Sequence, residues 1–385
     1  MEDSLGVLAI LSLNIIICEW LARNTVLKHF GTTLLVIIFT AIVANIGIVP
    51  AASNAPDIYG GIFTYVAPIS IFFLLLGVNL SHLKKAGIPM VIMFFAGALS
   101  TAIGAVVAIQ LIDGAESLGE SYKALAGMMT GTYIGGSVNF NAIALHYNIN
   151  EDGSLYAGTV AVDNILTALW MVISIMLPKL LHRWLPTKKV IDDNATSKED
   201  MEAVHKEHET IDPLHLAILI FMGAMTLWVS NFLADWLMGF GINFPSILIL
   251  TTIALVLAQI PAIQKINGAK VLGLYAIYLF LAVIGAFCEI AALNKIGSLA
   301  VTVGIFTTAV VFIHGLLIYL IGGLTKQDWD LVAVASQANV GGPSSALALA
   351  KSLNRTDLIL PSILVGTLGA GVGTYIGFFV AEVIL

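Results

Sequence analysis

Thr130-Gly131-Thr132-Tyr133-Ile134-Gly135-Gly136-Ser137-Val138-Asn139-Phe140-Asn141 is a polar segment inside a run that is otherwise apolar enough to lie in a membrane. A second segment of the same kind, Ser336-Gln337-Ala338-Asn339-Val340-Gly341-Gly342-Pro343-Ser344-Ser345, follows in the other half of the chain. In hydrocarbon each unpaired backbone group costs several kcal/mol, so such glycine breaks persist only where they line a cavity enclosed by protein. Two breaks in corresponding halves therefore indicate a transport site.

The composition defines the environment of the chain. Of its 385 residues 58% are hydrophobic and 11% are charged, and the mean hydropathy is +0.96. These values predict an all-α polytopic protein of the inner or plasma membrane, with the lipid bilayer as its surroundings. The formal charge of -7 says little about partners, because eight acidic residues fall in one stretch between Asp192 and Asp212.

Apolar stretches of membrane-spanning length divide the chain into two halves. We expect twelve segments, six in a first repeat (1–182) and six in a second repeat (213–385), separated by a charged linker (183–212). The segments lie at 4–22, 32–49, 60–80, 88–112, 123–146, 155–181, 213–237, 244–261, 271–291, 298–322, 331–350 and 358–384. The halves align weakly at Lys85-Ala86-Gly87 with Lys295-Ile296-Gly297 and at the two glycine breaks, which indicates an internal duplication.

The distribution of lysine and arginine predicts the topology. If all twelve segments cross the membrane, the loops carry 7 Lys or Arg on one side and 10 on the other. If the two segments with glycine breaks instead enter and leave on one face, the cytoplasmic side carries 15 and the outside only Lys123 and Lys295, as the positive-inside rule requires. Each half then has five crossings and one re-entrant hairpin, so the second half is inverted relative to the first. Both termini lie outside and the linker 183–212 is cytoplasmic.

The two glycine motifs and this layout resemble the YjcL-like bacterial membrane proteins of unknown function. That family is similar to a wider group of inverted-repeat carriers, which includes bile-acid, citrate and glutamate symporters and sodium/proton antiporters. The resemblance implies an elevator-type secondary transporter, usually a homodimer, in which a mobile core surrounds the two broken segments. It implies no particular substrate.

The broken segments supply the candidate binding groups. Freed backbone carbonyls suit a cation, and the N-termini of the half-helices suit a carboxylate. We predict that substrate binds at Thr132, Ser137, Asn141, Gln337, Ser344 and Ser345. Side-chain oxygens of Asn139, Asp163, Asn164 and Asn339 are predicted to bind Na⁺ as coupling ion, and Gly135, Gly136, Gly341, Gly342 and Pro343 to act as structural hinges. The alternative is that the glycines serve close helix packing and the amides satisfy one another.

Asp163 is an ionisable residue some eight positions into the sixth segment, and a carboxylate at that depth indicates function. A sodium ligand is the leading interpretation, a proton-exchanging acid is the second, and a structural hydrogen bond is the third. In the related antiporters the helix after the broken one carries an Asp-Asp or Asn-Asp pair, whereas here the order is Asp163-Asn164. His314, in the tenth segment, is expected to be a neutral histidine bonded to a neighbour rather than a proton carrier.

Other classes of function lack their characteristic residues. The sequence contains no His-Glu-x-x-His, Gly-x-Ser-x-Gly, Walker A or Cys-x-x-Cys motif, so we expect no enzyme and no cofactor besides Na⁺. It has no basic groove with interleaved aromatics for nucleic acid. The sequence therefore favours sodium-coupled symport of a small polar organic solute such as a carboxylate, an amino acid or a short peptide. A cation/proton antiporter that uses Asp163 and a membrane scaffold or holin-like regulatory protein are the alternatives.

Overall fold

The computed structural model describes residues 3–25, 27, 31–51, 54–80, 83–185, 212–242, 244–288 and 290–385, and for 290–298 only the backbone. The described part of the chain consists of helices and connecting turns, without strands. The predicted linker 183–212 lies largely outside the described residues, so its place stays a prediction.

The first half contains a series of helices that match the predicted segments. They are α1 (Ser4–Asn24), α2 (Gly31–Asn45), α3 (Asp57–Gly61), the π-helical turn η3 (Ile62–Val66), α4 (Ala67–Leu75), α5 (Ile88–Leu111), the short α6 (Gly114–Ser117), α7 (Tyr122–Gly135), α8 (Ser137–His146) and α9 (Gly153–Trp184). The third predicted segment is thus one rod made of α3, η3 and α4. The fifth is broken into α7 and α8.

The second half repeats this order. Its helices are α11 (Pro213–Met238), α12 (Ser246–Ala258), α13 (Ala269–Phe287), α14 (Ile290–Leu324), α15 (Trp329–Val340), α16 (Gly342–Ser352) and α17 (Ile359–Phe379), which continues into the π-helical η9 (Val380–Ile384). The eleventh predicted segment is broken into α15 and α16. Short 3-10 turns join the helices, among them η4 (Leu83–Ala86), η6 (Ile149–Glu151) and η8 (Thr356–Leu358).

Eight of the described helices are long and apolar enough to cross a membrane, and α2 and α12 are shorter apolar helices. Large hydrophobic side chains lie exposed on the outer faces of these helices, for example Leu5, Trp228 and Phe232. Water would disfavour such a surface, whereas lipid tails cover it without cost. The protein is therefore a multi-pass α-helical membrane protein, as the composition predicts.

Local sequence explains several helix starts. The Asp3 carboxylate accepts a hydrogen bond from the Gly6 amide at the start of α1, and Asp152 accepts one from Leu155 at 2.9 Å at the start of α9. Such caps satisfy amides that have no partner within the helix. Before α5, Gly87 has φ 78°, a backbone conformation that side chains disfavour.

Both broken segments are antiparallel helical hairpins. In the first, Asn139 Nδ2 donates to the carbonyl of Gly131 at 3.2 Å, and a Cβ placed on Gly127 would contact Ile143. These pairs are equally spaced about Gly135, so α8 folds back along α7. In the second, α15 and α16 pack together, and Arg355 after α16 binds Asp328 before α15 at 2.6 Å. Each hairpin therefore begins and ends at the same end of the molecule.

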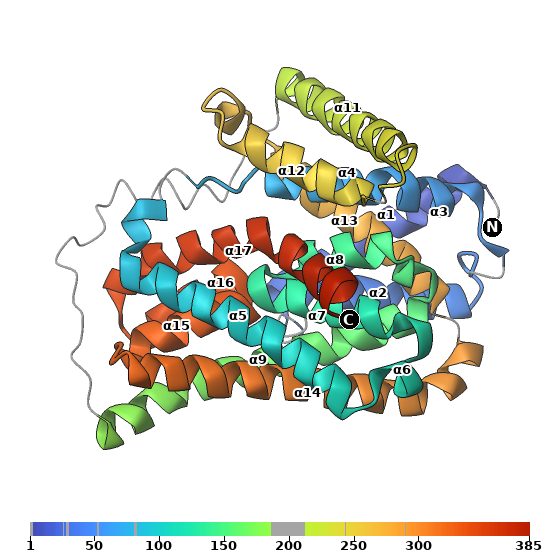
Figure 1. The fold of residues 1–385 in the computed structure, drawn as a ribbon. Helices are drawn as coiled ribbons and strands as arrows, with labels where there is room; N and C mark the ends of the chain where they lie inside the picture. Colours follow the sequence, from blue (N-terminus) through green and yellow to red (C-terminus); the bar gives the residue numbers. More distant parts are fainter. Residues whose placement is uncertain are drawn as a thin grey trace.

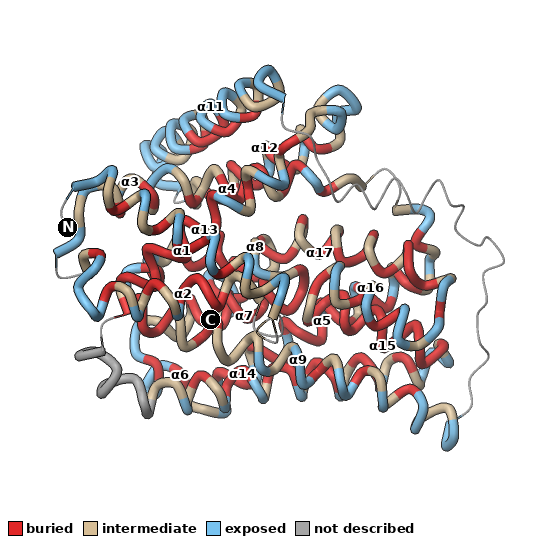
Figure 2. The backbone as a smooth tube through the Cα atoms, turned by 180° about the vertical axis from the view of Figure 1, so that it is seen from behind, coloured by how far each residue is buried: buried red, intermediate tan, exposed pale blue. Residues whose placement is uncertain are grey.

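The helices form two layers (Figure 1). The hairpins lie in a large body with α5, α9, α14 and α17, and α11, α12 and α4 lie along one side of it. Buried residues concentrate where α5, α7, α15 and α17 meet, whereas α11 is exposed along much of its length (Figure 2). Every residue of α15 is buried. The hairpins thus occupy the interior of the protein.

Contacts between the halves come in reciprocal pairs. Helix α7 packs on α17 and α15 packs on α9, while α2 packs on α13 and α12 packs on α4. Helices α5 and α14, which hold the same place in their halves, pack on each other. The main contacts between the halves thus have counterparts made by the equivalent elements.

Candidate substrate and ion site

A cavity of about 170 Å³ lies where the two hairpin breaks meet α9. The first hairpin contributes its break and the start of α8, the second contributes the end of α15 and its break, and one face of α9 closes the side. The lining residues are Thr33, Thr132, Gly136, Ser137, Phe140, Asn141, Tyr156, Val160, Asp163, Asn164, Thr167, Val340 and Gly341. Seven of the predicted site residues are among them: Thr132, Gly136, Ser137, Asn141, Asp163, Asn164 and Gly341.

Asp163 is the one carboxylate among the lining residues, which include no Lys, Arg or His. The hydroxyl of Thr167 donates to its Oδ1 at 3.5 Å, and the buried hydroxyl of Tyr133 adjoins the same carboxylate. Asn164, which also lines the cavity, donates from Nδ2 to the carbonyl of Val160 at 2.8 Å, so its Oδ1 remains available as an acceptor. Asp163 and Asn164 together give this wall of the cavity a surplus of oxygen acceptors.

The first hairpin faces Asp163 with hydroxyls and one amide. Thr132 and Ser137 line the cavity, and their hydroxyls have no hydrogen-bond partner among the described residues. Asn141 Oδ1 accepts a short hydrogen bond from the hydroxyl of Tyr156. Because one side of the Asn141 amide is held in this way, its Nδ2 remains as a donor for a ligand.

The predicted residues of the second hairpin are divided. Only Gly341 and its neighbour Val340 line the cavity. Gln337 is fully buried one turn earlier beside Gly341, and both atoms of its side-chain amide lack a hydrogen-bond partner among the described residues. Ser345 Oγ donates to the carbonyls of Gly342 (3.1 Å) and Gln337 (3.5 Å), and Ser344 is exposed away from the lining.

Asn139 and Asn339 lie outside the cavity lining. Asn139 Nδ2 donates to the carbonyls of Gly131 and Gly369, both at 3.2 Å, and its Oδ1 accepts from Thr374 at 2.8 Å. In its hydrogen-bonded orientation the Asn339 amide donates to the carbonyls of Phe94 (3.2 Å) and Ala335 (3.1 Å). Both amides thus join the hairpins to their neighbours, and their predicted role as sodium ligands stays a prediction.

Two of the predicted hinge residues, Gly135 and Pro343, make close backbone contacts with α17. A Cβ on Gly135 would lie 1.9 Å from the carbonyl carbon of Gly369, and one on Gly366 would lie 2.6 Å from Cα of Pro343. Gly136 and Gly342 have φ of 95° and 73°, which glycine adopts readily. The first hairpin break therefore packs directly on α17. The second break also contacts α17, at Pro343, but it faces α9 across the cavity, so the site is asymmetric.

A buried polar network lies behind the second hairpin, around His314 and Ser336. The sequence pointed to a hydrogen-bonded His314 but not to its partners. His314 Nδ1 lies 2.9 Å from the hydroxyl of Thr101 and 3.1 Å from the carbonyl of Gly97, and its Nε2 lies 2.9 Å from Ser336 Oγ. Trp170 Nε1 also donates to Ser336, at 3.0 Å. Because the Gly97 carbonyl only accepts, the arrangement suits a neutral ring with Nδ1 protonated. His314 is thus bonded to its neighbours, as expected, and connects α5, α14 and α15.

Sequence reasoning missed several lining residues. Tyr156, Val160 and Thr167 lie on the same face of α9 as Asp163, at spacings of seven, three and four residues. Helical periodicity from Asp163 would have found them. Thr33 had no signal, because its place in the lining depends on how α2 packs against α9.

A second cavity, of about 280 Å³, lies between the end of the first hairpin and the layer of α4, α11 and α12. Its lining includes Asn148, Asn150, Glu151, Asn231 and Ser246. It contains none of the predicted site residues. We therefore keep the cavity at Asp163 as the candidate site.

Comparison with known proteins places these features in a family. Residues 6–385 match the family described as "Protein of unknown function (DUF819)". The chain is also 28% identical over 354 residues to the protein named "Uncharacterized membrane protein YjcL" of Bacillus subtilis (strain 168), a match that covers 88% of this chain and 86% of that protein. The described fold and the site belong to the matched region.

Proposed function

This chain belongs to the DUF819 family, and we propose that it is a secondary active transporter that couples uptake of a small polar organic solute to sodium. The observation that carries the proposal is the cavity in which the two hairpin breaks face Asp163. A polar cavity at the centre of a membrane protein, lined by interrupted helices, is the arrangement that transporters use to bind solute and ion together.

The reciprocal contacts support two inverted repeats. If the halves are related by a twofold axis, each contact between them has a partner with the roles exchanged. The pairs α7 with α17 and α15 with α9 meet this requirement, as do α2 with α13 and α12 with α4. The axis then passes between α5 and α14 and near the hairpin breaks, where a solute could be reached from either side.

Contacts between segment ends support the topology with five crossings per half. Asn45 Nδ2 donates to the carbonyl of Cys288 at 2.8 Å, Tyr147 donates to Glu382, and Gln259 Nε2 donates to the carbonyl of Val78 at 2.9 Å. If all twelve segments crossed, each of these pairs would lie on opposite faces of the membrane. With two re-entrant hairpins, each pair lies on one face. The elevator motion implied by the resemblance remains part of the proposal.

The acceptors around Asp163 support a cation as coupling ion. The Asp163 carboxylate, Asn164 Oδ1 and the hydroxyls of Thr132 and Ser137 are the uncharged and anionic oxygen ligands that a hard cation prefers. A bound Na⁺ would neutralise Asp163, so the site need not stay charged while it crosses the low-dielectric interior. Sodium bound here would also leave the Asn141 amide free to bind the solute.

The size of the cavity supports a small solute. A volume of about 170 Å³ equals roughly six water molecules at about 30 Å³ each, which suits a small carboxylate or an amino acid better than a short peptide. Since no cationic side chain is among the lining residues, a solute carboxylate would depend on the Na⁺, the Asn141 amide and the helix starts at Ser137 and Gly342.

A cation/proton antiporter remains the second candidate, because the half-buried Asp163 could release a proton when it binds a cation. A non-transporting scaffold is the third candidate, but such a protein would not need a polar cavity between the two hairpin breaks.

The test is reconstitution of the purified chain into liposomes with a panel of carboxylates, amino acids and short peptides, with and without an inward sodium gradient. Sodium-dependent accumulation of one solute class, absent from liposomes with Asp163→Asn, is the expected result. Proton movement driven by sodium alone would instead support antiport. No sodium- or solute-dependent flux of any kind, in folded protein, would contradict the proposal.

A further inference from the structure

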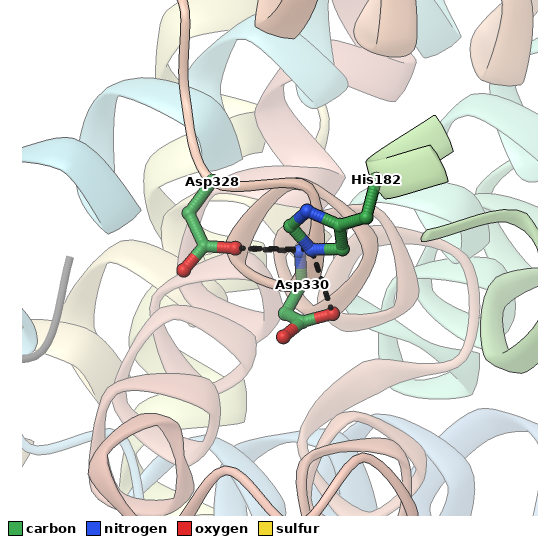
Figure 3. Close-up of side chains that lie close together, drawn as sticks. All are labelled: His182, Asp328 and Asp330. Atoms are coloured by element: carbon green, nitrogen blue, oxygen red, sulfur yellow. Dashed lines mark hydrogen bonds and ion pairs between the residues drawn. The ribbon is translucent and has the colours of Figure 1, made fainter. Parts of the chain in front are cut away.

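His182, Asp328 and Asp330 meet at the base of the second hairpin (Figure 3). His182 lies on α9, several helical turns after Asp163. His182 lies in the last turn of α9, Asp328 caps the start of α15, and Asp330 lies in the first turn of α15. His182 Nε2 lies 3.8 Å from Asp328 Oδ1 and 3.5 Å from Asp330 Oδ1. One ligand atom from each of the three side chains lies within 4.8 Å of the others.

The outer oxygens of the two carboxylates are already bound. Arg355 Nη1 lies 2.6 Å from Asp328 Oδ2 and 3.0 Å from Asp330 Oδ2, and its Nη2 lies 2.7 Å from Asp357. The Asp330 amide donates to Asp328 Oδ1 at 3.0 Å, which leaves a second lone pair on that oxygen. Arg355 thus fixes both carboxylates so that their Oδ1 atoms turn toward His182. This is a preorganised arrangement of ligands.

The charges of the cluster do not balance. Among the described residues three carboxylates face one guanidinium, so the net charge of these groups is -2 when His182 is neutral, and Asp328 is fully buried. Buried charge is stable only if it is compensated. A proton on His182 would supply one positive charge, whereas a divalent cation would supply both.

The distances also favour a cation between these groups. His182 Nε2 is buried and has no hydrogen-bond partner among the described residues. Its separations from the two Oδ1 atoms are long for a hydrogen bond. Two ligands that each lie about 2.0 to 2.2 Å from one ion are roughly 3 to 3.5 Å apart, so the separation from Asp330 fits and that from Asp328 needs a side-chain shift of a few tenths of an ångström.

We infer that His182, Asp328 and Asp330 form a binding site for a divalent transition cation of the Zn²⁺ or Mn²⁺ class. One imidazole and two carboxylates suit these ions better than Ca²⁺ or Mg²⁺, which take oxygen ligands. The His182 side chain is 24% exposed, which gives the ion a route from water. The bound ion would join the end of α9 to the base of the second hairpin, independently of the transport proposal.

The test measures metal binding by the full chain, purified in detergent and freed of metal with a chelator. His205 and His208 of the linker could bind metal themselves, so the reference chain carries His205→Ala and His208→Ala. We expect one Zn²⁺ per chain by calorimetry and a melting temperature that rises with Zn²⁺ concentration. Co²⁺ as a spectroscopic probe should give a visible absorption band that Zn²⁺ removes.

His182→Ala and the more conservative Asp330→Asn should each weaken Zn²⁺ binding at least tenfold and remove the Co²⁺ band. His146→Ala, at the end of the other hairpin, should leave both unchanged. If Zn²⁺ fails to bind the reference chain, the cluster is only a set of ion pairs and the inference is wrong. Zn²⁺ binding that survives both His182→Ala and Asp330→Asn would also overturn it.

Discussion

Asp163 and Asn139 are polar side chains in the interior of one membrane protein, but their surroundings differ. Asp163 opens on the cavity and has one long hydrogen bond from Thr167, whereas every polar atom of the Asn139 amide is bound by protein. A group that is already satisfied gains little from an ion, and a group that is not satisfied gains much. We therefore expect substitution at the two positions to have different consequences.

Asp163→Asn keeps the size of the side chain and removes its charge. We expect sodium binding, measured by calorimetry, to be lost, because no other carboxylate of the described residues lines the cavity. In the wild type, solute and sodium should each tighten the binding of the other by the same factor, since coupling is reciprocal. Asp235→Asn, on the exposed face of α11, is the matched control. Antiport is favoured instead if no tested solute changes the sodium affinity and if that affinity falls steeply as the pH is lowered.

Asn139→Ala should lower stability. The substitution leaves the carbonyl of Gly369 and the hydroxyl of Thr374 without their buried partner, which costs about 1 to 3 kcal/mol. A lower melting temperature in detergent would show this cost. Ser137→Ala, at the cavity, should keep the wild-type melting temperature and reduce uptake. If Asn139→Ala melts like the wild type but has lost sodium binding, Asn139 is an ion ligand and not a packing element.

At the scale of elements, the first hairpin is held to α17 by glycine. Its break carries no side chain at Gly135, and α17 carries none at Gly369, so the two backbones approach more closely than any Cβ would permit. Asn139 completes this contact through the Gly369 carbonyl. The second hairpin has no such contact with α9, and the cavity occupies the equivalent space.

Gly135→Ala should prevent close packing of the hairpin on α17, because the new Cβ would lie 1.9 Å from a backbone carbon that no rotamer change can move. We expect much less folded protein on size-exclusion chromatography. Gly158→Ala in α9 is the control, because a Cβ there meets nothing within 4 Å. Equal yields and melting temperatures for the two variants would show that the Gly135 contact is not required.

At the scale of the whole molecule, the proposed odd number of crossings per half would place equivalent elements on opposite faces of the membrane. The segment-end contacts, from Asn45 with Cys288 to Asp328 with Arg355, agree with this arrangement. In the proposed arrangement both sides of the membrane would be equivalent in architecture. The residues that differ between the halves, Asp163 foremost, would then decide the direction of coupling.

Cysteine labelling tests this topology in cells, since the two native cysteines are buried. Cysteines introduced at the exposed positions Glu120 and Glu151, on either side of the first hairpin, should react with an impermeant reagent from outside. A cysteine at Ser352 should react only after permeabilisation. Labelling of positions 120 and 151 from opposite faces would mean that the fifth segment crosses, and the inverted arrangement would be wrong.

The sequence by itself determined the class of the protein, the twelve apolar segments and the two breaks. These features depend on local properties: a span needs a fixed length of apolar residues, and a Gly-Gly pair set among amides and hydroxyls favours a break, whereas Gly322-Gly323 in an apolar run lies within α14. The family followed from the same motifs. The described helices agree with all twelve segments, including the split of the fifth and eleventh at their glycines.

Only the tertiary structure decided which polar residues face the cavity. Asn139 and Asn141 are two residues apart on α8, so they point about 200° apart around the helix, and packing turned Asn141 to the cavity and Asn139 to α17. Both residues have the same amide side chain, so the sequence does not tell which face of α8 meets the cavity and which meets α17. For the same reason it could not bring His182 to Asp328 and Asp330, because they come from different halves of the chain.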